Sequence, residues 1–246
     1  MNNQRSQRRS SMMVRLVAVL AVAMMFTMCF VGGTFAKYVT SASVNDNQAQ
    51  VAKWGVTVTA EDKADNTLFK TTYATDNESV SGSITNSVVS SSAAKLVAPG
   101  TEGGVLKFSV KGTPEVAVNV SFAMTVNSDV KIGKDSEKAA ELGLNTTDYT
   151  PVVFTLKKNG AQVAQGTLTD IKTYLEGATI SKNYEANTNL DNTFGDYELT
   201  WAWAFGTGDT DVKDTYLGNV AAGTITDDKV STTIDFDLAI TVTQID

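Results

Sequence analysis

The sequence predicts an all-β protein, a two-sheet sandwich of jelly-roll type with short helices in the connections. From Lys37 onward, Thr, Val and Ile fill 62 of 210 positions, and β-branched residues favour strands over helices. Roughly eight strands are expected along the chain, and the clearest of them alternate apolar and polar residues, which is the period of a half-buried strand. With 42% hydrophobic residues the chain can bury a core. These observations favour two packed sheets.

The first 36 residues are predicted to be a secretory signal peptide. Residues 1–15 hold four arginines and no acid, Leu16 to Val31 are apolar, and Thr34 and Ala36 are small residues at positions −3 and −1. Signal peptidase is therefore expected to cut before Lys37. The alternative is a permanent anchor, but sixteen helical residues span about 24 Å of a roughly 30 Å hydrocarbon core. We expect a secreted protein that meets a membrane only through the uncleaved signal peptide.

Residues 37–51 are predicted to be a flexible N-terminal arm, followed by one domain over residues 52–246. Small polar residues dominate the arm. Its apolar points, which are able to fill a groove, are Tyr38, Val39, Val44 and Val51. Such an arm can be added to a sheet edge as a donor strand, or it can be a disordered terminus without a role.

The first strands of the domain follow from alternation and from one turn signal. Val56 and Val58 alternate with threonines after Trp54, and a long strand has valines and other apolar residues at even positions from Val116 to Val126. Pro99-Gly100 predicts a turn before the strands that follow it. The strands expected here are 54–59, 67–73, 105–110 and 116–126.

Two short helices and a hairpin are predicted next. Asp135 to Leu142 carries its acids early, on the favourable side of a helix dipole. Asn159-Gly160 predicts a hairpin turn between 152–158 and 161–166, because both central residues of a type I′ turn need positive φ. Thr167 to Glu176 is expected to be the second helix, with leucine and isoleucine on one side.

The clearest strand alternates five large residues with small ones, and a last strand is expected from Val230 to Ile240 or beyond. The five large residues are Tyr197, Leu199, Trp201, Trp203 and Phe205. We interpret the two tryptophans as core residues and not as a platform for ligand stacking.

Charge and composition exclude several function classes. The segment from Lys37 to Asp246 has 16 lysines and 27 acids, a formal charge of −11, and no Arg, His or Cys. A polyanion without arginine is a poor nucleic-acid binder. Ser-His-Asp, Cys-His and zinc chemistry each need a residue that is missing. We therefore expect no enzyme, no catalytic residue and no cofactor.

Calcium is the one metal for which the sequence has candidate ligands. Asp209, Asp211 and Asp214 are expected in a glycine-bearing loop, and carboxylate oxygens suit calcium. Their spacing matches no established calcium loop. We interpret the segment as a solvated acidic loop and predict no metal site.

Several short motifs, in this order, resemble the secreted TasA and camelysin family of Gram-positive bacteria, whose signal peptides are of a dedicated, SipW-dependent type. The resemblance touches most of the chain. The motifs are Gly32-Gly33-Thr34-Phe35-Ala36-Lys37-Tyr38, Ala52-Lys53-Trp54-Gly55-Val56, Val97-Ala98-Pro99-Gly100-Thr101, Gly112-Thr113-Pro114-Glu115-Val116, Leu199-Thr200-Trp201-Ala202-Trp203-Ala204-Phe205 and Asp214-Thr215-Tyr216-Leu217-Gly218.

The resemblance implies a jelly-roll subunit that self-assembles, with the same or related subunits, into extracellular biofilm-matrix fibres by donating an N-terminal strand. Camelysin-like relatives carry a metallopeptidase label, which a chain without histidine does not support. The alternative function is a monomeric cell-surface adhesin or carbohydrate-binding module that uses aromatic residues such as Tyr149, Tyr174 and Tyr184.

Overall fold

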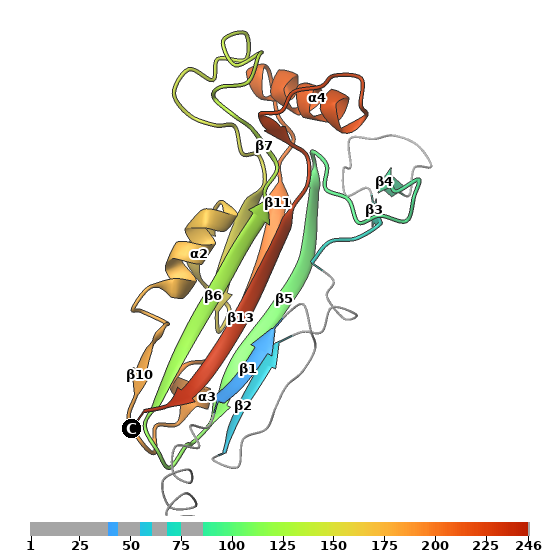
Figure 1. Cartoon of the computed structure of the whole chain (residues 1–246). Helices are drawn as coiled ribbons and strands as arrows, with labels where there is room; N and C mark the ends of the chain where they lie inside the picture. Colours follow the sequence, from blue (N-terminus) through green and yellow to red (C-terminus); the bar gives the residue numbers. More distant parts are fainter. Residues whose placement is uncertain (1–38, 44–54, 61–67, 75–85, 246) are drawn as a thin grey trace, which may run out of the picture. The chain divides into compact units, whose positions relative to one another are not determined.

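The computed structural model describes residues 39–43, 55–60, 68–74 and 86–245. All of these residues belong to one compact unit, residues 39–246. Within that unit, two antiparallel sheets enclose one hydrophobic core. The predicted all-β sandwich with helices in its connections is therefore confirmed (Figure 1).

The first sheet has four strands in the order β1-β13-β6-β10. Every neighbouring pair is antiparallel. β13 and β6 form the long centre of this sheet, with β1 and β10 as shorter strands at its two edges. The bounds are β1 Val39–Ser43, β6 Val118–Ser128, β10 Lys182–Tyr184 and β13 Asp235–Gln244.

The second sheet has five strands in the order β2-β5-β11-β8-β9, again antiparallel throughout. Asn159 and Gly160 both have positive φ in the turn between β8 and β9, as the hairpin prediction required. The bounds are β2 Val56–Ala60, β5 Thr101–Gly112, β8 Val153–Lys158, β9 Ala161–Gly166 and β11 Asp196–Trp203.

Three described helices and two small two-stranded sheets complete the unit. The helices are α2 Leu168–Glu176, α3 Leu190–Thr193 and α4 Asp209–Ala221. The small sheets pair β3 Thr72–Ala74 with β4 Asn86–Val89, and β7 Lys131–Ile132 with β12 Val230–Ser231.

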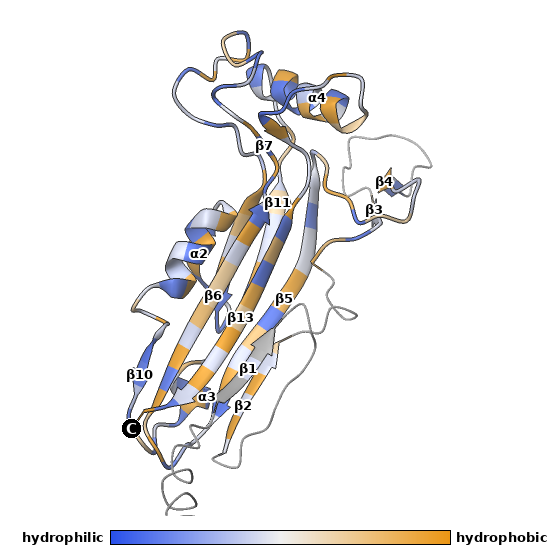
Figure 2. Ribbon diagram, in the orientation of Figure 1, coloured by the Kyte–Doolittle hydropathy of each residue, from blue (hydrophilic) through white to orange (hydrophobic). Residues whose placement is uncertain are grey.

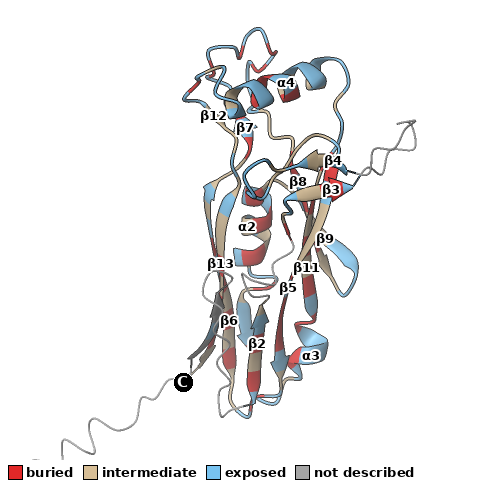
Figure 3. Cartoon of the chain, turned by 90° about the vertical axis from the view of Figure 1, so that its right-hand side faces the viewer, coloured by how far each residue is buried: buried red, intermediate tan, exposed pale blue. Residues whose placement is uncertain are grey.

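The core lies between the two sheets, as the red residues of Figure 3 show. In β11 the buried positions alternate, with Tyr197, Leu199, Trp201 and Trp203 all inside. Aromatic rings join the sheets: Phe108 of β5 stacks on Tyr197 at 5.3 Å between centroids and meets Phe122 of β6 at 5.6 Å. Such pairs add about 0.5–1.5 kcal/mol each beyond their burial.

Helix α2 closes one side of the sandwich. It contacts β6, β8 and β9 and begins at Thr167, whose side chain caps the helix in a capping box with Asp170. Glu176 Oε1, on the last residue of the helix, accepts from the Met124 amide at 2.8 Å, and Ser181 Oγ, just after the helix, accepts from the Phe122 amide at 3.0 Å. These side chains accept hydrogen bonds from the backbone amides on the edge of β6 beyond the residues that pair with β10.

Several predictions of local structure are wrong. The segment 135–142 forms successive turns and not a helix, because Ser136 Oγ donates to the buried Asp227 and holds the segment in place. Phe205 is not part of β11, which ends at Trp203. The last strand is divided into β12 and β13. Of the predicted strand 67–73 the structure describes residues 68–73, and β3 begins only at Thr72.

The two ends of the sandwich differ. At one end, called the α4 end, Trp203 of β11 donates to Asp214 of α4. At the other, called the α3 end, the Gly112 amide of β5 donates to Asp191 of α3. β5 and β13 both run from the α4 end to the α3 end (Figure 1). Apolar residues recur along both strands (Figure 2).

Candidate functional site

Strand β1 comes from the predicted arm and lies at the edge of the four-stranded sheet. Its backbone pairs with β13 from Val39 opposite Thr243 to Ser43 opposite Ala239. Thr40 and Ala42 are opposite Val242 and Ile240, whose side chains are fully buried. Main-chain pairing along five residues is the kind of contact on which strand addition depends.

β1 and β2 contact one another and point in the same direction (Figure 1). Both run from the α3 end toward the α4 end, because each is antiparallel to a strand that runs the other way. The chain must therefore reverse between Ser43 and Val56 to place both strands in one copy. Residues 44–55 make this connection, which is twelve residues and can span about 40 Å when extended.

Of the residues predicted to act in export and assembly, the structure describes only Val39, in β1. Thr34, Ala36 and Lys37 of the predicted cleavage site lie outside the described residues. So do Tyr38, Val44 and Val51 of the predicted arm.

The three calcium candidates lie in helix α4 and not in a loop. Asp209 and Asp211 are exposed in its first turn, where negative charge is favourable. Asp214 is buried one turn later, and its Oδ1 accepts from Tyr149 Oη at 2.7 Å and from Trp203 Nε1 at 3.2 Å. In the part of the chain that the structure describes, no three acidic residues are grouped to hold a metal ion.

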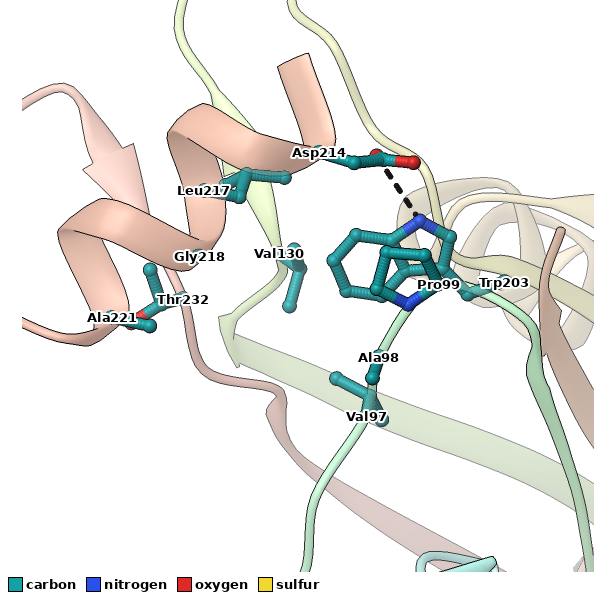
Figure 4. A pocket seen from close by; sticks show the side chains of 10 residues that line it. All are labelled: Val97, Ala98, Pro99, Val130, Trp203, Asp214, Leu217, Gly218, Ala221 and Thr232. Carbon is teal, nitrogen blue, oxygen red and sulfur yellow. Dashed lines mark hydrogen bonds between the residues drawn. The ribbon is translucent and has the colours of Figure 1, made fainter. Parts of the chain in front are cut away.

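Asp214 forms part of the wall of a cavity of about 150 Å³ at the α4 end (Figure 4). Burial raises the pKa of its carboxyl, and the hydrogen bonds from Tyr149 and Trp203 offset this only in part. Its Oδ2 is buried without a hydrogen bond of normal length to any described residue. The other walls are mostly apolar and include Pro99, Val130 and Leu217.

A second buried aspartate, Asp227, was not predicted. Its Oδ2 accepts from Ser136 Oγ at 2.6 Å and from Tyr216 Oη at 2.9 Å, while its Oδ1 accepts from the Lys229 amide at 2.9 Å. Burial alone would raise the pKa of Asp227, but these donors outweigh it and leave the pKa below its ordinary value. Three distant segments meet here, so no local signal could have revealed the group.

The aromatic residues considered for ligand binding are mostly buried or hydrogen-bonded within the domain. Tyr184 is buried, and Tyr149 bonds to Asp214. Tyr174 is partly buried against the core. Trp201 donates its indole N–H to the Leu68 carbonyl. Trp201 and Trp203 are both buried, so they are core residues, as predicted.

None of the helices within the described ranges is long and apolar enough to cross a membrane. Comparisons with protein-family models, with curated proteins and with solved structures found no significant match to this chain. The resemblance to the TasA and camelysin family therefore stays a prediction that rests on the short motifs.

Proposed function

We propose that this protein is a secreted structural subunit of an extracellular fibre, of the kind found in a biofilm matrix, and that copies join by exchanging β1. The observation that carries the proposal is the placement of β1. It is an edge strand, its backbone pairs with β13 along five residues, and it is joined to β2 by a connection of twelve residues, 44–55.

The direction of β1 favours exchange between copies. Within one copy, the chain leaves β1 pointing toward the α4 end and must turn back to the α3 end to begin β2. If β1 pairs with β13 of a neighbouring copy, residues 44–55 can continue in the same direction, toward that neighbour's α4 end, without turning back. The same hydrogen bonds form in both arrangements, so exchange costs few contacts, as in domain swapping.

Repeated exchange makes a chain of copies. Each copy gives one β1 and receives one, and the donor and acceptor positions are different surfaces. An interface of this head-to-tail kind gives an open polymer when the rotation does not close a ring. Export by a signal peptide and a cysteine-free segment after residue 36 agree with a fibre outside the cell that is held by packing and strand pairing.

Cysteine trapping tests the exchange directly, because residues 37–246 contain no cysteine. Ser41 is exposed and lies opposite Thr241. Mixing Ser41→Cys chains with Thr241→Cys chains under assembly conditions should give a disulfide between copies. The double variant, oxidised as a monomer, should stay monomeric and assemble only after reduction. The proposal would be contradicted if the oxidised double variant assembled without reduction, or if a chain lacking residues 39–43 still assembled.

A further inference from the structure

We propose that the α4 end carries a docking surface for the α3 end of the next copy, with Phe205 as its anchor beside the cavity of Figure 4. This inference rests on the proposed exchange of β1 and adds a second contact to it. The occupant is a second copy of this chain.

The reach of the connection determines which ends meet. In the exchanged arrangement Ser43 pairs with Ala239 of the acceptor, four residues from the start of β13 at Asp235. Those four residues take about 14 Å of the roughly 40 Å that residues 44–55 can span. The next copy begins its β2 at its own α3 end, at Val56. About 40 Å minus about 14 Å leaves roughly 26 Å, so its α3 end lies within that reach of the acceptor's Asp235, on the side of the α4 end.

Phe205 is an unusual residue for a free surface. It is 67% exposed, more than any other large hydrophobic residue that the structure describes. Its ring lies over Gly100, where an added Cβ would be only 2.1 Å from the Phe205 Cε2 atom. Gly100 also has a φ of 78°, which favours glycine. Because Gly100 has no side chain, the Phe205 ring can pack against the turn while most of it stays exposed, as expected for an interface anchor.

The neighbouring cavity supplies the receiving part of the surface. Pro99, next to Gly100 in the chain, lines it together with Val97, Leu217 and Ala221. Figure 4 shows these side chains around an opening between α4 and the turn at Pro99. A cavity of about 150 Å³ is large enough for one apolar side chain. An exposed ring beside an apolar cavity is the combination that tight interfaces use at their centre.

The test compares three variants of residues 37–246, the segment that contains the compact unit. Phe205→Glu places a charge on the anchor, and Ala221→Trp fills the cavity from an exposed position. Ala123→Glu adds the same charge on the exposed face of β6 and is the matched control. Circular dichroism and the melting temperature should be unchanged in all three, because each position is exposed or at a rim.

Sedimentation then measures the critical concentration for assembly. Phe205→Glu and Ala221→Trp should each raise it about tenfold or more, and Ala123→Glu should change it by less than about twofold. If the mixed Ser41→Cys and Thr241→Cys disulfide forms but either surface variant assembles like Ala123→Glu, the docking surface is overturned and strand exchange stands. If that disulfide never forms, both proposals fall together.

Discussion

Replacing Asp227 with alanine should destabilise the α4 end strongly. The carboxylate is 7% exposed and accepts three hydrogen bonds, two of them from the buried Ser136 and Tyr216. Leaving a buried donor unpaired costs about 1–3 kcal/mol, so two unpaired donors cost roughly 2–6 kcal/mol. The third donor is the backbone amide of the exposed Lys229, where a water molecule can replace the lost carboxylate oxygen. A domain has only about 5–15 kcal/mol of stability, so the loss is large.

Urea unfolding followed by tryptophan fluorescence measures this loss, with Asp228→Ala as the matched control. Asp228 is the next residue, carries the same charge, and pairs only with the exposed Lys229 side chain. Asp228→Ala should leave the midpoint within error, because exposed ion pairs contribute little. Hydrogen exchange should show the Asp227→Ala loss first around α4 and residues 133–148. Equal midpoints for the two variants would refute the reasoning.

Two further predictions concern the second aspartate and a close backbone contact. Burial raises the folded-state pKa of Asp214 above its unfolded value, so the folded protein binds the proton more tightly and Asp214 favours folding increasingly as pH falls. The free energy of unfolding of the native protein, relative to that of Asp214→Asn, should therefore rise as the pH is lowered from about 7 to about 4 in urea titrations. A difference that stays flat or falls as the pH is lowered would contradict this sign. At Gly112, φ is 117° and an added Cβ would lie 1.8 Å from the Gly55 carbonyl oxygen, whereas a Cβ at Gly160 meets nothing within 4 Å. Gly112→Ala should thus lower the melting temperature clearly more than Gly160→Ala, which carries only the strain of its own positive φ.

The sequence predicted the parts of this fold that depend on local pattern. Val118 to Met124 and Tyr197 to Trp203 alternate as expected, because a half-buried strand imposes a period of two on its own residues. The turn at Asn159-Gly160 and the helix over 167–176 were also predicted, since each depends on residues close together in the chain, although Thr167 proves to be the cap and not the first helical residue. Helix α4 was missed because few of its residues are buried and a glycine lies inside it.

Composition by itself determined that the segment after Ala36 is an acidic β-domain without histidine, arginine or cysteine. Only the tertiary structure decided that Val39–Ser43 pairs with the edge of β13, that Asp214 and Asp227 become buried acceptors, and that Phe205 stays outside. Each of these results depends on residues brought together from distant parts of the chain. Periodicity reports which residues a strand buries, but edges, buried hydrogen bonds and exposed anchors depend on which strands become neighbours.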